Sequence, residues 1–383
     1  MKILIITHYF PPHHGGTENV AYNQVKMLAE LGHDVTVVTS AIPSRVGICN
    51  EKFSIIRVPA FNILEAKLGV PYPIFGPRIF NILDREIKKA EIVNGHGYVY
   101  VPVVIGAQLA RHYKKPFVLT QHNTFIEYKS SILRGMQHIA GFTIGKATIN
   151  CAVDIVCVSG ATQDYVNSIK PVASRVHYNG IDINRFKPSA DIAALRRRLS
   201  IPVNKTICFC IRRITFKNGI DTLLEVADLL RSRKDVLFII GGKGPDFPAA
   251  QEIVKQKKLT NVRLLGMVSD KELPNYYAAS DIFILPSKKG EGFPLVVLEA
   301  LASGIPVIAT RSGGHTEIIE TGKHGYIVEP EESDKIAEHI VCLTDQPTLL
   351  EQMKKYSRRL AVESLSWEKN VEFLLRVFEG ALS

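Results

Sequence analysis

The feature that most constrains the fold is an alternation of short β-branched runs with segments of helical periodicity, which continues from one end of the chain to the other. Residues 2–7 and 35–39 have the composition of strands, and the apolar residues between them recur at helical spacing. Alternating strands and helices form parallel sheets that are buried on both faces. The sequence therefore predicts an α/β protein built from doubly wound, Rossmann-like sheets.

Two such series follow one another, and a chain of 383 residues exceeds what one ordinary core supports. In the first series, further strands are expected at residues 91–94, 116–120, 154–159 and 176–178. In the second, strands are expected at 206–211, 236–241, 262–265, 282–285 and 307–310, with helices near 219–231, 246–257, 295–303 and 334–343. We predict domains at residues 1–175 and 176–365, and a C-terminal helix within 366–383 that crosses back to the first domain.

The composition excludes several classes of protein. With 46% hydrophobic and 22% charged residues the chain is globular, and no apolar run approaches the ~20 residues that cross a bilayer. The apolar stretch at residues 3–6 is too short for a signal peptide. The six cysteines include no Cys-x-x-Cys pair, and Cys208 and Cys210 are expected to be buried free thiols on one face of a strand. We therefore expect a cytoplasmic protein.

The net charge of +10 is concentrated in the first half of the chain. The segment up to Arg175 has 18 Lys and Arg and 11 Asp and Glu, whereas the remainder has 29 Lys and Arg and 26 Asp and Glu. A basic half could face an anionic membrane, a phosphorylated acceptor or nucleic acid, or be an ordinary solvated surface. Nucleic acid is not expected, because no recognition motif or aromatic-basic interleaving is present. The apolar, Pro-rich stretch at residues 61–83 could be a lipid-facing or acceptor-facing surface, or a loop and helix packed on the domain.

Ligands of open α/β sheets bind beyond the carboxyl ends of the strands, so the loops that follow strands are the candidate sites. The first such loop ends in Gly15 and Gly16 and enters a helix. Paired glycines let a ligand approach the backbone, and a helix N-terminus favours an anion such as a diphosphate. The turn is not Gly-x-Gly-x-x-Gly, which disfavours an NAD enzyme, and a plain turn remains an alternative.

The second loop follows the predicted strand at residues 206–211 and contains Arg212, Arg213 and Lys217. Cations beside a helix N-terminus suit a pyrophosphate leaving group, and each charge-assisted hydrogen bond is worth ~1.5–3 kcal/mol. A solvated basic loop is the alternative interpretation.

The third loop follows the predicted strand at 282–285 and has Glu291 before a predicted helix and Glu299 inside it. Carboxylates accept hydrogen bonds from hydroxyls, so the two could hold a sugar ring and a ribose. The free amides of Leu295 and Val296 at the helix start could bind a phosphate. Glu299 lies in an apolar run, where burial without a donor is costly. A polar helix start with a half-exposed second glutamate is the alternative.

Together, these features resemble the retaining GT-B glycosyltransferases of family four, which include phosphatidylinositol mannosyltransferases and sucrose synthases. The resemblance spans nearly the whole chain, in motifs at residues 15–18, 179–186, 239–245, 281–287 and 291–307. It implies two Rossmann-like domains that face each other across a cleft. It also implies transfer of a hexosyl group, with retention, from a GDP- or UDP-sugar to a lipid or glycan acceptor in cell-envelope glycan or glycolipid synthesis.

The resemblance implies roles for single residues. Gly15 and Gly16 would approach the donor diphosphate, and Arg213 with Lys217 would neutralise it. His122, which follows the predicted strand at 116–120, would face the donor sugar and acceptor. Glu291 would hold the sugar hydroxyls and Glu299 the ribose, and the remaining donor-binding residues would be Gly292, Phe293, Pro294, Leu295 and Val296. The sequence lacks an Asp-x-Asp motif, so we expect neither a metal nor a cofactor.

The sequence departs from the family pattern in the basic loop. Arg212 stands where the family has glycine, and Asn218 separates Lys217 from Gly219. Either Lys217 reaches the phosphate, or Asn218 occupies that position and the charge is lost; we predict Lys217. Two other functions remain open, a nucleotide-sugar epimerase with the same two-domain scaffold and a non-catalytic nucleotide-sugar sensor.

Overall fold

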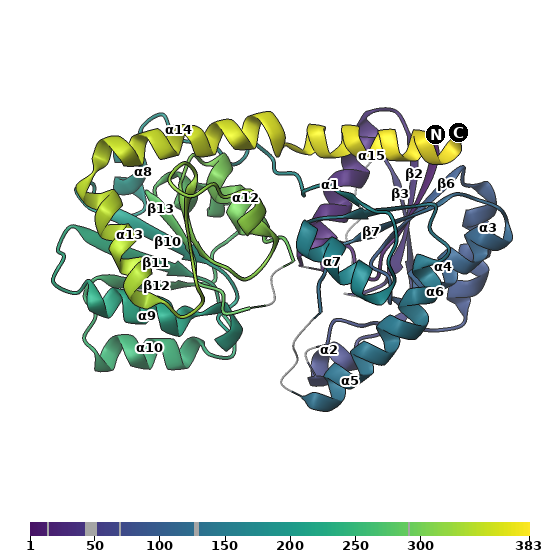
Figure 1. The fold of residues 1–383 in the computed structure, drawn as a ribbon, viewed down its shortest axis with the longest axis horizontal. Coiled ribbons are helices and arrows are strands. Elements are labelled where there is room, and N and C mark those ends of the chain that lie inside the picture. Colours follow the sequence, from purple (N-terminus) through teal and green to yellow (C-terminus); the bar gives the residue numbers. More distant parts are fainter. Residues whose placement is uncertain (14, 43–51, 69, 126–129, 290–291) are drawn as a thin grey trace. The chain divides into compact units, whose positions relative to one another are not determined.

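The structure is a computed structural model that describes residues 1–13, 15–42, 52–68, 70–125, 130–289 and 292–383 (Figure 1). The chain forms two compact units. The N-terminal unit consists of Met1–Gly180 and Trp367–Ser383, and the C-terminal unit of Ile181–Ser366. The boundary between the units lies slightly after the predicted division at residue 175.

The N-terminal unit is built on a parallel sheet of seven strands in the order β3-β2-β1-β6-β7-β8-β9. Along β1, alternate side chains point to opposite faces, so Leu4 and Ile6 enter one core while Ile3 and Ile5 enter the other. The strands are β1 (Lys2–Ile6), β2 (Asp34–Ser40), β3 (Ser54–Val58), β6 (Ile92–His96), β7 (Phe117–Gln121), β8 (Asp154–Cys157) and β9 (Arg175–Val176). A separate antiparallel pair joins β4 (Ala60–Phe61) to β5 (Ile74–Phe75).

Helices cover both faces of this sheet. One face is covered by α1 (Gly16–Glu30) and α15 (Trp367–Leu382), and the other by α3 (Arg78–Lys89) and α4 (Val101–His112). The remaining helices are α2 (Ile63–Leu68), α5 (Ser131–Ala140), a π-helix at Gly141–Gly145, α6 (Lys146–Ile149) and α7 (Gly160–Ile169). The stretch at 61–83 thus becomes a short hairpin, α2 and the start of α3.

The C-terminal unit has a parallel sheet of six strands in the order β12-β11-β10-β13-β14-β15. Cys208 and Cys210 are free and lie in the same buried core, as predicted. The strands are β10 (Thr206–Ile211), β11 (Val236–Gly241), β12 (Val262–Gly266), β13 (Ile282–Leu285), β14 (Val307–Thr310) and β15 (Gly325–Val328). The helices are α8 (Ile192–Arg198), α9 (Ile220–Leu229), α10 (Phe247–Gln256), α11 (Leu273–Ala278), α12 (Leu295–Ala302), α13 (Ser333–Asp345) and α14 (Pro347–Ser364), with 3-10 turns at Phe216–Asn218 and Gly314–Glu317.

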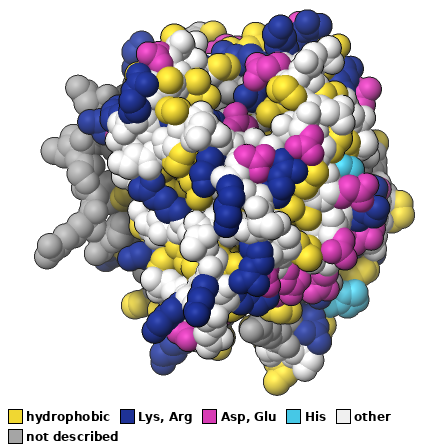
Figure 2. Space-filling view, turned by 90° about the vertical axis from the view of Figure 1, so that its left-hand side faces the viewer, with side chains coloured by type: hydrophobic (Ala, Val, Ile, Leu, Met, Phe, Trp, Pro, Cys, Tyr) yellow, Lys and Arg dark blue, Asp and Glu magenta, His cyan; other side chains and the backbone are white. Residues whose placement is uncertain are grey.

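The surface of the C-terminal unit has both signs of charge. On the side that Figure 2 shows, Lys and Arg side chains are interspersed with Asp and Glu. Among the described residues, no helix combines the length and apolar character needed to cross a membrane.

Each sheet has one point where the strand order reverses. In the N-terminal unit the reversal lies between β1 and β6, and in the C-terminal unit between β10 and β13. The loops that leave neighbouring strands at such a point diverge to opposite faces of the sheet and open a crevice, which is where doubly wound proteins bind ligands. The carboxyl ends of β1, β6, β10 and β13 are therefore the places to look for a site.

Candidate functional site

The basic loop leaves β10 at the reversal point of the C-terminal unit. Arg212 donates hydrogen bonds through Nη1 to the Ser287 hydroxyl and through Nη2 to Asn218 Oδ1 at 3.0 Å. Asn218 in turn donates from Nδ2 to the carbonyl oxygen of Arg213 at 2.5 Å, and only 4% of Asn218 is exposed. Arg213 and Lys217, by contrast, are exposed. The inserted asparagine therefore braces the loop from inside, and Lys217 is the residue whose side chain is free to reach a ligand.

Contacts with the loop after β13 fix the backbone around Lys217. The Lys288 amide donates to the Lys217 carbonyl at 2.9 Å. The Lys288 ammonium is already occupied, because it pairs with Asp221 at 2.8 Å and Glu331 at 2.7 Å. Next along the chain, Gly219 adopts φ 69° and ψ 28° and is the N-cap of α9, which begins at Ile220. These contacts fix the backbone position of Lys217. The Lys288 ammonium, which is already paired, is not available as a second phosphate ligand.

The segment after β13 supplies an uncapped helix start. Glu291 lies outside the described residues. The Gly292 carbonyl accepts a hydrogen bond from the Gly314 amide at 3.0 Å, which ties the segment to the loop after β14. Phe293 and Pro294 are buried, whereas Leu295 and Val296 open α12 partly exposed, and no side chain caps the helix. The amides of Leu295 and Val296 are thus placed to bind an anion.

Glu299 is the most strongly perturbed acid of this segment. Its Oε2 is buried, and no hydrogen-bond partner for that atom exists in the described ranges. Burial raises the pKa of Glu299 to about 7, although the nearby Tyr277 hydroxyl and the charge of Arg185 act in the opposite direction. A buried carboxylate without a sufficient donor is a costly feature in a protein core. Ligand hydroxyl groups are donors of the kind that this oxygen lacks.

This raised pKa predicts how nucleotide binding depends on pH. The pKa of Glu299 in the folded protein lies above the ordinary value. In the protein without ligand, the free energy of unfolding therefore falls as the pH rises toward 7 and this carboxyl group ionises. Hydroxyl groups that donate to the carboxylate favour its ionised form, so binding of a nucleoside diphosphate should tighten by about tenfold between about pH 6 and about pH 8. Calorimetry in buffers of different ionisation enthalpy would detect the released proton.

The Glu299→Gln variant is the matched comparison, because the ligand phosphates also titrate near this range. The variant should keep the phosphate-dependent part of the pH profile and lose the remainder. Identical profiles for the two proteins would exclude contact between the ligand hydroxyls and Glu299.

In the N-terminal unit, three histidines gather at the carboxyl ends of adjacent strands. His8, His96 and His122 lie at or after the ends of β1, β6 and β7. His96 Nδ1 and His122 Nε2 are 2.9 Å apart and share a hydrogen bond. Burial, together with the nearby His8, lowers the pKa of His122 to about 4. His122 is therefore neutral near pH 7 and can offer a ligand a hydrogen bond but not a positive charge.

A second cluster lies beside these histidines and was missed by the sequence analysis. His13 bridges two carboxylates, with Nδ1 at 3.3 Å from Glu18 Oε1 and Nε2 at 3.3 Å from Glu65 Oε2. Burial alone would lower the pKa of His13, but Glu18 and Glu65 outweigh it and raise the pKa. His13 and Glu18 belong to the segment that enters α1, but Glu65 comes from α2, so the local motif could not indicate the bridge.

The two glycines at the start of α1 differ in their surroundings. Gly15 is extended, and a Cβ there would lie 2.1 Å from Glu18 Oε2, whereas a Cβ on Gly16 would meet no described atom within 4 Å. The Glu18 carboxylate therefore lies against Gly15, at the helix start for which a diphosphate was predicted. A diphosphate that bound there would meet this negative charge, which His13 partly compensates.

The predicted residues thus form two groups, one in each unit. Arg213, Lys217 and the described part of the 291–299 segment lie on the loops at the β10/β13 reversal point. Gly15, Gly16 and His122 lie at the carboxyl edge of the N-terminal sheet. The structural role of Arg212 was missed by the sequence analysis, because its place in the motif normally belongs to glycine and one of its two partners, Ser287, is 75 residues away.

Comparison with known proteins places the chain among enzymes of sugar transfer. Residues 14–185 match the family model described as Glycosyltransferase Family 4, and residues 191–360 match that of Glycosyl transferases group 1. The chain is 26% identical to the N-acetyl-alpha-D-glucosaminyl L-malate synthase of Bacillus anthracis, over 97% of this chain and 95% of that protein. It is 25% identical to the alpha-monoglucosyldiacylglycerol synthase of Acholeplasma laidlawii, over 93% and 91% of the two chains.

Solved structures have the same fold. The crystal structure of Anabaena HepE in complex with UDP superposes with a TM-score of 0.82 and 19% identity, over 99% of this chain and 100% of that chain.

Proposed function

The chain belongs to glycosyltransferase family 4 and has the GT-B fold, and from this premise we propose that it is a retaining, metal-independent hexosyltransferase. The donor is a GDP- or UDP-linked sugar, and the acceptor is a lipid or glycan of the cell envelope. The observation that carries the proposal is the arrangement at the β10/β13 reversal point. There, two exposed cations, Arg213 and Lys217, lie with the uncapped start of α12 and the buried carboxylate of Glu299.

These groups fit the chemistry of glycosyl transfer. Breaking the bond between sugar and phosphate leaves negative charge on the nucleoside diphosphate. Arg213 and Lys217 stabilise that charge, assisted by the amides of Leu295 and Val296, and Glu299 holds the ribose. Because these groups are preorganised, they stabilise the leaving group without a metal ion. Neutral His122 accepts or donates a hydrogen bond at the sugar.

The similarity to HepE, which was crystallised with UDP, supports UDP as the nucleotide. The first test is a thermal-shift panel of UDP-, GDP- and ADP-sugars on the whole protein. A cognate donor at about 100 times its Kd adds about 2.7 kcal/mol of stability by mass action. Equal melting temperatures with every donor would contradict the proposal.

A lipid acceptor is supported by an exposed apolar stripe on α5. Ile132, Met136 and Ile139 recur at helical spacing with 73%, 60% and 65% of their surface exposed. Such a stripe suits the boundary between lipid headgroups and acyl chains. The diacylglycerol acceptor named for the Acholeplasma relative fits the same interpretation. The free cysteines of the described chain suit a reducing compartment, so we place the enzyme at the cytoplasmic face of the membrane.

Charge on this stripe should release the protein from membranes. Replacing Ile132 and Met136 together by Asp is expected to weaken binding to anionic phospholipid vesicles by about tenfold or more. Cosedimentation with the vesicles measures the loss. Val203→Asp/Met267→Asp is the matched control, because it adds the same two negative charges at residues that are 52% and 71% exposed but lie in the C-terminal unit. Equal binding by the α5 variant and the control would show that α5 does not contact lipid.

A further inference from the structure

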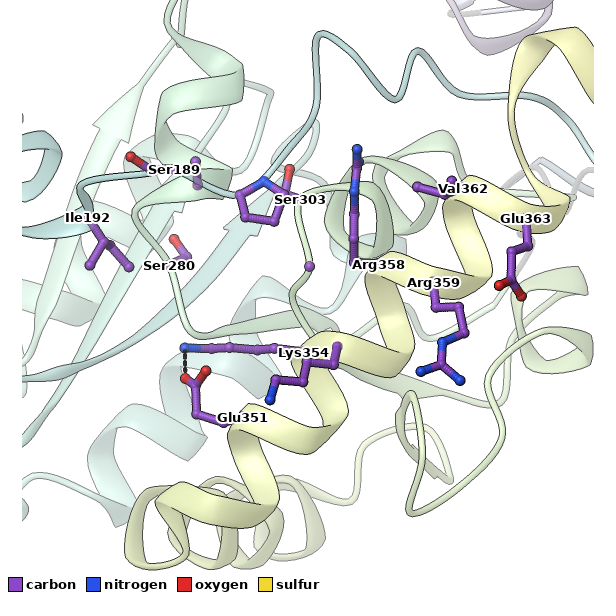
Figure 3. A pocket seen from close by; sticks show the side chains of 14 residues that line it. Ser189, Ile192, Ser280, Ser303, Glu351, Lys354, Arg358, Arg359, Val362 and Glu363 are labelled. Carbon is purple, nitrogen blue, oxygen red and sulfur yellow. Dashed lines mark hydrogen bonds and ion pairs between the residues drawn. The ribbon is translucent and has the colours of Figure 1, made fainter.

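The C-terminal unit contains a cavity that the proposed reaction does not use (Figure 3). Its volume of about 610 Å³ is within the range of small-molecule sites. Ser280 precedes β13, and Ser303 and Gly304 precede β14, so the cavity lies at the amino ends of the strands. The loop that carries Arg213 follows the carboxyl end of β10, and α12, which carries Glu299, begins after the carboxyl end of β13 in the same sheet. The cavity is therefore separate from the donor site.

One wall of the cavity is a basic stripe on α14. Lys354, Lys355, Arg358 and Arg359 lie one helical turn apart in pairs and line the cavity together. Figure 3 shows Lys354, Arg358 and Arg359 on α14, with Ile192 on the other side of the cavity. Against these four cations the lining contains two carboxylates, those of Glu351 and Glu363. The wall therefore has an excess of positive charge.

The charges of this stripe are compensated unequally. Lys354 pairs with Asp281 at 3.1 Å and Glu351 at 2.8 Å. Burial would lower the pKa of Lys354, but Asp281 outweighs it and raises the pKa, so this ammonium stays charged and occupied. Lys355 and Arg359 are exposed, and neither forms an ion pair within the described part of the chain.

Arg358 is held differently from the other three cations. Its guanidinium donates to the backbone carbonyls of Ile183, Phe186 and Ala302 at 3.0, 3.0 and 2.6 Å. Burial lowers the pKa of Arg358, and no carboxylate opposes that effect. A guanidinium has five N–H donors, so two remain for a ligand. Arg358 is thus fixed in position, partly buried and without a neutralising anion among the described residues.

The lining also includes a hydroxyl without a hydrogen-bond partner in the described part of the chain. Ser303 is 4% exposed, and its Oγ has no hydrogen-bond partner among the residues that the structure describes. Apolar side chains form much of the remaining lining, including Pro188, Ile192 and Val362. The cavity therefore combines fixed cations and a buried polar group with an apolar surface.

The walls are held in place before any ligand binds. Arg196 donates to Asp281 Oδ2 at 2.5 Å, and the same oxygen accepts from the Ile207 amide at 2.8 Å. With Lys354 on Oδ1, these bonds join α8, β10, β13 and α14 around one carboxylate. A site whose walls are fixed loses little conformational entropy on binding.

We propose that this cavity binds a phosphate ester that has an apolar portion. The phosphate contacts Lys355 and Arg359, which lie one helical turn apart, and Arg358, whose guanidinium points away from that of Arg359 in Figure 3, adds positive charge to the wall. Several cations, among them a guanidinium fork, suit a phosphate better than a single carboxylate because a phosphate carries more charge and more acceptor oxygens. The Ser303 hydroxyl donates to the ester or its attached group, and the apolar portion lies against Ile192 and Val362. A phospholipid headgroup and a free phosphorylated metabolite share this chemistry.

The probe for the test is n-hexyl phosphate, titrated calorimetrically into the whole protein, with inorganic phosphate as the comparison. We expect saturable binding that is tighter for hexyl phosphate than for inorganic phosphate. In the Lys355→Glu/Arg359→Glu variant the affinity should fall by about tenfold or more, because two exposed cations are reversed. Both side chains are exposed, so the fold should be retained.

The matched control is Lys234→Glu/Lys255→Glu, which makes the same change of net charge at exposed lysines of the same unit away from the cavity. The control should bind hexyl phosphate as the unmodified protein does. Equal affinity of the cavity variant and the control for hexyl phosphate would overturn the proposal, because the ligand would then bind elsewhere, for example at the donor site. The lack of saturable binding would also overturn it.

A second arm distinguishes the two sources of the phosphate. Vesicles of equal parts phosphatidylcholine and phosphatidic acid are cosedimented with the Ile132→Asp/Met136→Asp protein, so that α5 does not mask the result. If the cavity variant removes the remaining vesicle binding, the phosphate belongs to a lipid. If the cavity variant loses hexyl phosphate binding while its vesicle binding stays the same, the phosphate belongs to a soluble metabolite. Both results support the site.

Discussion

Replacing Lys217 by Ala is expected to lower turnover about 100- to 1,000-fold, the loss that follows removal of one preorganised charge stabiliser. The Lys217 side chain is exposed, and its ammonium has no partner within the described ranges, so the substitution should not unfold the protein. The Lys288 amide holds the Lys217 backbone at 2.9 Å, which fixes where the side chain begins. Turnover with a saturating donor is the quantity to measure, beside the melting temperature.

Two comparisons make this result specific to the position. Lys234→Ala removes an exposed lysine elsewhere in the same unit and should leave turnover unchanged. Asn218→Ala removes the buried brace between Arg212 and the Arg213 carbonyl and should lower stability as well as turnover. Undiminished turnover in Lys217→Ala would show that the charge on the leaving group is stabilised elsewhere.

Replacing Gly219 by Ala is expected to destabilise the C-terminal unit by more than about 2 kcal/mol, through two separate effects. Gly219 has φ 69° and ψ 28°, a left-handed conformation that costs other residues roughly 1–2 kcal/mol. A Cβ would also lie 1.7 Å from the carbonyl oxygen of Pro286, a backbone atom directly after β13. Either α9 or the end of β13 must shift, and the basic loop lies between them.

Gly322→Ala separates the two effects. Gly322 has φ 82°, but a Cβ there would meet no described atom within 4 Å, so only the conformational cost of roughly 1–2 kcal/mol applies. Urea denaturation monitored in the C-terminal unit by hydrogen exchange compares the two variants. Equal losses would mean that the contact with Pro286 relaxes without cost.

Much of the fold could be predicted because its signal is local. Each central strand is a short β-branched run, and β10, β11 and β13 coincide with the predicted ranges. The edge strand β15 was missed because it begins with a glycine, a residue that is depleted in strands. The predicted helix from residue 219 begins one residue later, since Gly219 takes a left-handed conformation that the helical pattern does not reveal.

Some residues of the candidate site could likewise be predicted from local sequence patterns, and others could not. Arg213, Lys217 and Glu299 could be found because each belongs to a local motif after a strand. The sequence favoured Lys217 over Asn218 but could not give the reason, which is the burial of Asn218 and its contact with Arg212. The ion pairs of His13 with Glu18 and Glu65 could not be predicted either, since Glu65 is distant from the other two residues in the sequence.

The most direct measurement follows the sugar itself. The protein is incubated with UDP- and GDP-hexoses labelled in the sugar, with and without a lipid extract of cell envelopes. Our account predicts that label enters the extract only when acceptor is present, that one nucleoside diphosphate is released per sugar transferred, and that the anomeric configuration is retained. Conversion of the donor to a different sugar nucleotide without acceptor would indicate an epimerase. Donor binding without any turnover would indicate a sensor, and either result would contradict the account.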